Sequence, residues 1–141
     1  MENNQEIIRL ENLSKTFELR YHKTLRAVDA VSLSLPKGVC TAVVGESGCG
    51  TSTLARMAAL LEPVTEGAIY YKGQQIGGIK DGQPVSIRGE SLRAYRRHVQ
   101  MIFQDPVNVF SPRMKIGTIL MEPWIHFEKK TKKEARALAL Y

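Results

Sequence analysis

Apolar and polar residues alternate in two segments near the start of the chain. In residues 28–35, Val31, Leu33 and Leu35 would share one face of a β-strand, with two serines on the other. Residues 7–13 alternate less regularly but favour the same structure. We therefore predict two strands that each bury one face.

Two other segments are apolar without regular alternation. Residues 39–44 form a short apolar run without polar alternation, which is typical of a strand covered on both faces, as in a parallel sheet. Residues 98–103 predict another buried strand. Residues 67–72 and 74–76, separated by a glycine, predict a small hairpin or an edge element. Residues 79–89 predict an exposed loop because glycine and proline recur there.

Helical periodicity begins after the first continuous apolar run. Four apolar residues recur at i, i+3, i+4 and i+7, which predicts a helix over 52–61 that ends before Pro63. Residues 90–97 predict a short basic helix, and 116–122 predict one or two helical turns that stop before Pro123. The last helix is predicted over 131–141, with Thr131 as its N-cap and Glu134 at position N3. The apolar face of the first helix would comprise Leu54, Met57, Ala58 and Leu61.

Composition and charge narrow the function classes. The 141 residues suffice for one domain, and no run approaches the length of a membrane span. Residues 1–87 carry as many acidic as basic side chains, so the net charge of +6 falls in residues 88–141, which argues against a uniformly basic nucleic-acid protein. The polar, acidic start does not resemble a signal peptide. Cys40 and Cys49 make neither a disulfide framework nor a zinc site, which favours a reducing, cytosolic compartment.

The glycine-rich segment 45–53 indicates a specific chemistry. It follows a predicted buried strand and opens a predicted helix, and Gly45 and Gly50 have the separation found in phosphate-binding loops. Glycines let successive backbone N–H groups point at one anion, and the helix N-terminus adds free N–H groups. Ser52 occupies the position of a magnesium-binding hydroxyl. A tight strand–helix turn would also need small residues, but it would not require this spacing.

One position departs from the phosphate-loop pattern. Position 51 should be lysine and is threonine. The lysine ammonium contacts the β and γ phosphates as a point charge, whereas Thr51 offers only a backbone N–H and a neutral hydroxyl. We therefore expect weakened nucleotide binding and a larger loss of hydrolysis.

Residues 43–56 closely resemble the ATP-binding subunits of ABC transporters, and the resemblance runs from Leu10 to the C-terminus. Residues 25–32 resemble the strand that these subunits carry before the loop. Three further blocks resemble the oligopeptide and dipeptide importer branch: Gln100-Met101-Ile102-Phe103-Gln104-Asp105-Pro106, Ser111-Pro112-Arg113-Met114 and Met121-Glu122-Pro123.

The resemblance implies an α/β fold. It would be a partial P-loop NTPase fold of the ABC type, with an antiparallel β subdomain and the start of a helical subdomain. The whole chain, residues 1–141, would be a truncated ATP-binding domain. Residues 1–104 would form the core and β subdomain, and residues 105–141 would begin the helical subdomain.

The resemblance also implies site residues, with ATP and Mg²⁺ as cofactors. Phe17 matches the aromatic residue that stacks on adenine, with Tyr21 as the alternative; Phe17 could equally be a core aromatic. Gln104 matches the glutamine whose side-chain oxygen reaches magnesium and the attacking water, so Ser52 and Gln104 would be the magnesium ligands. The residues lining the phosphates would be Gly45, Glu46, Ser47, Gly48, Cys49, Gly50, Thr51, Ser52 and Thr53.

Several family features are missing from the sequence. It contains no Leu-Ser-Gly-Gly-Gln signature and no apolar strand ending in paired acidic residues, so the second magnesium carboxylate and the general base are absent. We therefore assign no catalytic residue and do not expect this chain alone to hydrolyse ATP efficiently. The resemblance implies an ATP-binding subunit of an importer for peptides or related small solutes. Its partners would be membrane permease subunits and a second ATP-binding subunit, at the cytoplasmic face of the cell membrane.

Two other functions fit parts of the sequence. A non-catalytic interaction module would dock on a permease or a partner ATPase through residues 105–141. A nucleic-acid binder would use the basic run 129–133, but few aromatic residues are interleaved there and charge runs on helices are usually solvated faces. We expect no nucleic-acid partner. We also expect the chain to be marginally stable by itself, because a sheet without its later strands leaves an open edge.

Overall fold

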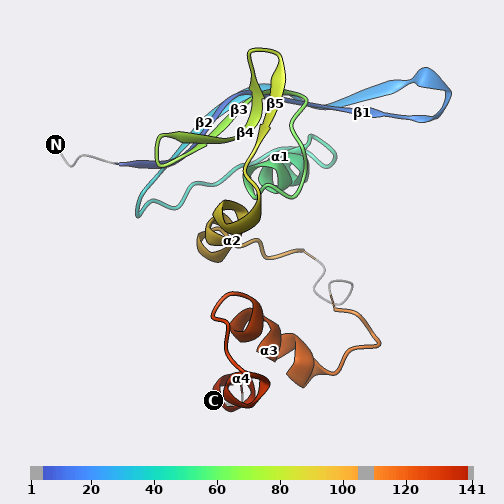
Figure 1. Ribbon diagram of the computed structural model, residues 1–141. Helices are drawn as coiled ribbons and strands as arrows, with labels where there is room; N and C mark the ends of the chain where they lie inside the picture. Colours follow the sequence, from blue (N-terminus) through green and yellow to red (C-terminus); the bar gives the residue numbers. More distant parts are fainter. Residues whose placement is uncertain (1–4, 105–109, 140–141) are drawn as a thin grey trace. The chain divides into compact units, whose positions relative to one another are not determined.

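The computed structural model describes residues 5–104 and 110–139 (Figure 1). These residues fall into two compact units, one extending to Leu92 and the other beginning at Arg93. The first unit contains a β-sheet, one complete α-helix and the start of a second, and the second unit is helical.

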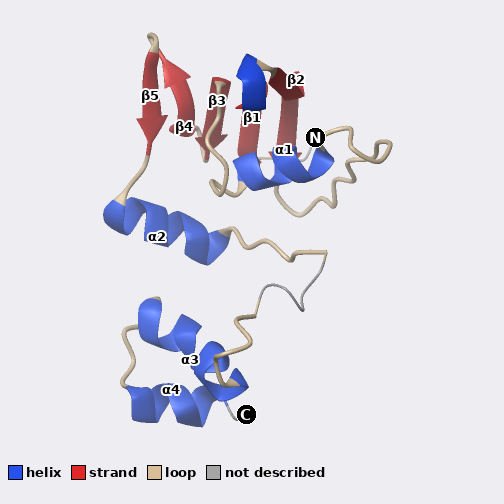
Figure 2. Cartoon of the chain, turned by 90° about the vertical axis from the view of Figure 1, so that its right-hand side faces the viewer, coloured by secondary structure: helices blue, strands red, loops and turns tan. Residues whose placement is uncertain are grey.

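The sheet of the first unit has five strands, all paired antiparallel, in the order β2-β1-β3-β4-β5. A 3₁₀ turn, η1 (Arg20–His22), lies between the first two strands, and helix α1 (Thr51–Ala58) contacts β1 and β2 (Figure 2). Because α1 lies against these strands, the loop that precedes it is held close to the sheet. The strands are β1 (Glu6–Glu18), β2 (Thr24–Pro36), β3 (Glu66–Tyr71), β4 (Gln74–Lys80) and β5 (Gln83–Ser86).

The two alternating segments form β1 and β2, as predicted, and both strands are longer than the pattern indicated. Leu10 pairs with Leu33, so apolar residues of both strands lie on the same side of the sheet. Along β2, Val31 and Leu33 are partly buried while the serines between and after them are exposed. The core of the unit also takes residues from α1 and the later strands. Its most buried apolar side chains are Leu10, Leu13, Met57, Ile69 and Ile76.

A β-bulge interrupts the alternation of β1. Its pairing register with β2 shifts between Leu10 and Leu13 and again around Lys15. As a result Leu13, Ser14 and Lys15 are buried in succession, which a regular strand would not allow. The Ser14 hydroxyl accepts a hydrogen bond of 3.0 Å from the backbone N–H of Ala30, which satisfies its buried oxygen.

The predicted hairpin of residues 67–76 is confirmed, but the predicted loop 79–89 is partly wrong. Strand β4 extends to Lys80, and β5 follows it after a two-residue turn. Asp81 and Gly82 both have positive φ, 51° and 75°, the geometry of a type I′ turn whose twist matches that of paired strands. The Asp-Gly pair therefore makes a hairpin where the density of loop-forming residues suggested an open loop.

The two continuous apolar runs do not form the predicted strands. Residues 39–46 and 99–103 have no regular secondary structure, and the side chains of Val44 and Ile102 are 91% and 95% exposed. A strand needs a neighbour for its N–H and C=O groups, and no described strand pairs with either run. An apolar composition thus favours a buried strand only where other strands lie beside it.

The predicted first helix is confirmed as α1, although it is shorter than its apolar pattern. Leu54 and Met57 are buried against the sheet, as expected. The helix ends at Ala58 rather than at Leu61, because Leu60 adopts a left-handed φ of 54° that no helix can continue. Leu61 is therefore largely exposed instead of lying on the buried face.

Helix α2 (Gly89–His98) agrees with the predicted basic helix and crosses the boundary between the units. In the second unit, α3 (Ile116–His126) packs against α4 (Lys132–Ala139), burying Met121 and Ala135. The prediction that Pro123 ends α3 is wrong, since the helix continues for three residues beyond it. No helix in the described part of the chain is long and apolar enough to cross a membrane.

The predicted capping box of α4 is confirmed. The Glu134 carboxylate accepts hydrogen bonds from the backbone N–H and the hydroxyl of Thr131, at 2.8 and 2.7 Å. The hydroxyl of Thr131 in turn accepts a longer bond from the Glu134 N–H, at 3.4 Å. The hydroxyl contact, the backbone contact and the nearby Lys130 charge together lower the pKa of Glu134 below its ordinary value. The last two residues of the predicted helix lie outside the described residues.

Candidate functional site

The glycine-rich loop leads directly into α1. Residues 45–49 are exposed, and the Cys49 N–H donates a hydrogen bond of 3.1 Å to the Glu46 carbonyl, which closes a turn within the loop. Gly50 is the N-cap of α1, and no side chain caps the helix there. The first amides of a helix have no partner within the helix, so these N–H groups are available to an anion at the loop.

Gly50 holds the loop close to strand β2. Its φ is 94°, in the left-handed region, and a Cβ placed on it would lie 2.0 Å from the carbonyl oxygen of Ala27. Both the backbone conformation and the space therefore require glycine here. The close approach fixes the start of α1 against the strand at Ala27.

The strand register brings Phe17 near this point of approach. Phe17 pairs with Leu25, and Lys15 pairs with Val28, so Ala27 lies opposite the segment of β1 just before Phe17. The ring of Phe17 is half-buried and the Lys15 ammonium lies 4.8 Å from its centroid. The alternative aromatic residue, Tyr21, lies four residues further along, beyond the end of β1, and is 91% exposed. The geometry favours Phe17 over Tyr21 as the aromatic residue beside the loop.

Lys15 is buried and lies against the Phe17 ring, which the sequence alone does not predict. Its ammonium contacts the Glu62 carboxylate at 2.6 Å and donates a hydrogen bond of 2.8 Å to the Pro63 carbonyl. The only sign of this contact in the sequence is that Lys15 lies two residues before Phe17. Residues at this spacing share one face of a strand, but the spacing does not show whether that face is buried.

The predicted polar ligands divide between the two units. Thr51 and Ser52 form the start of α1, with Ser52 exposed and Thr51 half-buried. Gln104 is an exposed residue at a bend in the second unit. The first unit thus brings together Phe17, the loop and Ser52, while Gln104 belongs to the other unit.

The donor set around Ser52 is an oxygen set without carboxylate clusters. In the described ranges, no group of three or more His, Cys, Asp or Glu side chains is arranged to hold a metal ion. A hydroxyl at the loop suits Mg²⁺, which takes oxygen ligands and is commonly held through substrate phosphates and waters rather than an all-protein cage. The exposed hydroxyl of Ser52, beside the uncapped helix end, fits this mode of binding.

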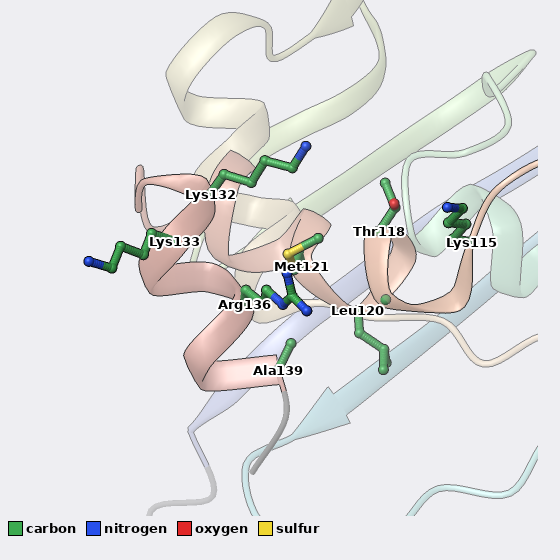
Figure 3. A pocket seen from close by; sticks show the side chains of 9 residues that line it. Lys115, Thr118, Leu120, Met121, Lys132, Lys133, Arg136 and Ala139 are labelled. Carbon is green, nitrogen blue, oxygen red and sulfur yellow. The ribbon is translucent and has the colours of Figure 1, made fainter.

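The second unit has a cavity of about 670 Å³ along α3 and α4. Leu120 and Met121 are among its apolar lining residues, and Figure 3 shows them with Arg136 among the side chains that line the cavity. The exposed apolar side chains of Ile116 and Leu138 lie on the same two helices. Four basic residues also line the cavity: Lys115, Lys132, Lys133 and Arg136.

Comparison with known proteins gives a consistent set of relatives. The family model described as ABC transporter matches residues 28–140. A probable peptide ABC transporter ATP-binding protein from Sinorhizobium fredii is 37% identical, and the alignment covers 94% of this chain and 37% of that protein. The oligopeptide transport ATP-binding protein OppF of Escherichia coli is 42% identical over 79% of this chain and 31% of its own length. The chain therefore spans about a third of the length of these relatives.

Solved structures with the same fold are longer as well. The bacterial ABC transporter cassette MJ0796, solved as a dimer, superposes with a TM-score of 0.71 at 23% identity, covering 95% of this chain and 54% of that one. A nucleotide-free ATP-binding cassette from an ABC transporter superposes with a TM-score of 0.61 at 25% identity, covering 94% of this chain and 46% of that one.

Proposed function

The chain belongs to the ABC transporter family, and we propose that it binds ATP at the loop that opens α1. Its fold is part of an ABC ATPase cassette, so the family and the fold predicted from the sequence are both confirmed. The relatives named above are ATP-binding proteins of peptide transporters, which supports the role of an ATP-binding subunit of an importer for peptides or related small solutes.

One observation carries the proposal. The loop 45–50 runs into a helix whose N-terminus has no side-chain cap, and Gly50 presses it against β2 close to Phe17. An anion at the helix end and a flat base against the half-buried ring would therefore belong to one molecule, a nucleotide. The phosphates would meet the backbone N–H groups of residues 45–53, and adenine would stack on Phe17.

Mg²⁺ would accompany the nucleotide. The Ser52 hydroxyl would hold the ion together with the phosphates, and Gln104 stays the second ligand that the resemblance implies. The bound ion would neutralise phosphate charge. Ser52 itself would orient the phosphates at the start of α1.

Threonine at position 51 sets the strength of this site. Without an ammonium on the β and γ phosphates, binding depends on backbone N–H groups, the helix end and the aromatic stack. The sequence contains neither the Leu-Ser-Gly-Gly-Gln signature nor a pair of acidic residues after an apolar strand. We therefore infer weak ATP binding with little turnover by this chain.

The partners follow from the same role. Residues 105–141 would begin the helical subdomain that faces permease subunits. The described part of that segment carries the cavity that apolar residues and four basic residues line. A second ATP-binding subunit would complete the assembly, on the cytoplasmic face of the cell membrane. The solved cassette MJ0796 is a dimer, which supports such an arrangement.

Calorimetric titration of the purified chain with ATP tests the proposal. We expect measurable, weak binding that strengthens with Mg²⁺ in the wild type but not in Ser52→Ala. The matched control is Ser86→Ala, which removes a hydroxyl from an exposed serine of β5 and should keep the magnesium effect. No heat of binding at millimolar ATP would refute the proposal. Tight binding with steady turnover would refute the role assigned to Thr51.

A further inference from the structure

Lys15 is a charged residue in the core of the first unit. Only 9% of its side chain is exposed, and its ammonium makes three contacts: the Glu62 carboxylate, the Pro63 carbonyl and the ring of Phe17. Taking an ammonium out of water is unfavourable unless it is paired, and apolar residues of similar volume often give equal or greater stability. Stability alone therefore does not account for a lysine here.

The contact with Phe17 places the Lys15 ammonium over the ring. A cation over an aromatic ring is attracted by the negative face of the ring, so the ammonium occupies one face and restrains the tilt of the ring. A base that stacks on this ring would then use the opposite face. A ring held in one orientation loses less freedom when a base stacks on it than a ring that rotates.

The other contacts of Lys15 connect the ring to the phosphate side of the site. Glu62 follows α1, and its backbone N–H donates a bond of 3.3 Å to the Arg56 carbonyl in the last turn of that helix. Two further hydrogen bonds join the same segments: the Thr65 N–H to the Ser14 carbonyl at 3.0 Å, and the Thr16 N–H to the Thr65 hydroxyl at 3.1 Å. The end of α1 is thereby fixed to the part of β1 that precedes Phe17.

We propose that Lys15 is a positioning residue for the base of the nucleotide, holding the Phe17 ring at a fixed place relative to the helix that binds the phosphates. The inference rests on the proposed ATP site and adds to it a residue that acts on base recognition only. The affinity for ATP would then have two separable parts. The phosphate part depends on the loop and α1, and the base part depends on Phe17 and on Lys15 through Phe17.

Comparing ATP with inorganic tripolyphosphate tests this separation, because tripolyphosphate keeps the anionic chain and lacks the base. The variants are Lys15→Met, Lys15→Arg and Phe17→Ala, with affinities measured by calorimetric titration in Mg²⁺. We expect Phe17→Ala to weaken ATP binding about fivefold to a hundredfold, the range of base–aromatic stacking. Lys15→Met should weaken ATP binding about threefold to tenfold, and both variants should bind tripolyphosphate within twofold of the wild type. Lys15→Arg keeps a cation for the ring and should stay closer to the wild-type ratio than Lys15→Met.

Glu62→Gln provides a second route if Lys15→Met does not fold. It keeps the shape and removes the charge that anchors Lys15, so it should lower the ratio of ATP to tripolyphosphate affinity in the same direction. Equal weakening of both ligands in a folded variant would assign Lys15 a structural role and overturn the inference, as would no change in either. If the wild type binds tripolyphosphate but Phe17→Ala leaves ATP unaffected, base stacking on Phe17 and the inference both fail while phosphate binding stands. If the wild type binds neither ligand, the proposed function fails with it.

Discussion

Restoring the missing lysine with Thr51→Lys tests the electrostatics of the site most directly. Position 51 is the first residue of α1, after a glycine N-cap whose left-handed conformation directs the loop into the helix. An ammonium at this position would add a charge next to the helix end, where the amides already favour an anion. We expect the variant to bind ATP more tightly than the wild type.

The surroundings of Thr51 set the size of this effect. Two unit charges 4 Å apart interact by about 1 kcal/mol in water and about 4 kcal/mol at an effective dielectric constant of 20. Thr51 is half-buried and loop residues 45–49 are exposed, so the lower part of this range applies. A gain of about 1–2 kcal/mol corresponds to an increase in affinity of roughly fivefold to thirtyfold.

Titration with ATP at several salt concentrations measures the gain. The control is Thr51→Met, which has a similar side-chain length and helix propensity but no charge. The difference between the lysine and methionine variants should shrink as ionic strength rises, since exposed charges are screened. Equal affinities of these two variants at low salt would refute the electrostatic role of position 51.

Three further substitutions test the local structure. Gly50→Ala should unfold the chain or lower its melting temperature far more than Gly48→Ala, which should cost about 1 kcal/mol of stability. Both glycines have positive φ, but only at Gly50 would the Cβ collide with the Ala27 carbonyl. Equal melting temperatures of the two variants would disprove the close approach. Glu134 has a lowered pKa in the folded chain, so its stabilising contribution is present above its ordinary value near 4.5 and is lost as pH falls through the lower folded-state pKa. Helical circular dichroism of Glu134→Gln should therefore be less sensitive to acid over that interval than that of the wild type. Pro123→Ala should stabilise α3 by about 1–3 kcal/mol in denaturant titrations, because alanine restores a backbone N–H inside the helix; no gain would mean that the helix has already adjusted to the proline.

Local signals were sufficient where the structure depends on neighbours in sequence. The spacing from Thr131 to Glu134 predicted a capping box, and the same hydrogen bonds occur in the structure. The position of Leu54 and Met57 on one face predicted the buried side of α1. These features need only a helix and one apolar surface, so a single sequence specifies them.

The positions of the residues proposed to hold the base could not be predicted from the sequence. A bulge in β1 places Lys15 in the core, and the pairing of Phe17 with Leu25 brings the ring near the glycine loop. Register is set by contacts between strands that are distant in sequence, and one inserted residue changes which side chains face inward. The resemblance could assign Phe17 a role, but it could not show that a buried lysine holds its ring.

The segments 39–44 and 98–103 show that an apolar composition alone does not predict a strand. Val44 and Ile102 are almost fully exposed, although both segments were predicted to be buried strands. An apolar composition indicates that burying the segment would stabilise the fold, by roughly 25 cal/mol per Å² of apolar surface. It does not indicate which other segment would bury it. Residues 39–44 lead into the glycine loop, so a strand paired there would fix the loop from its N-terminal side. In the described chain the loop is fixed at its other end, by Gly50 against Ala27 and by α1 against β1 and β2. The arrangement of the phosphate side of the site therefore rests on one glycine and one short helix, which is why substitution at Gly50 should affect binding and folding together.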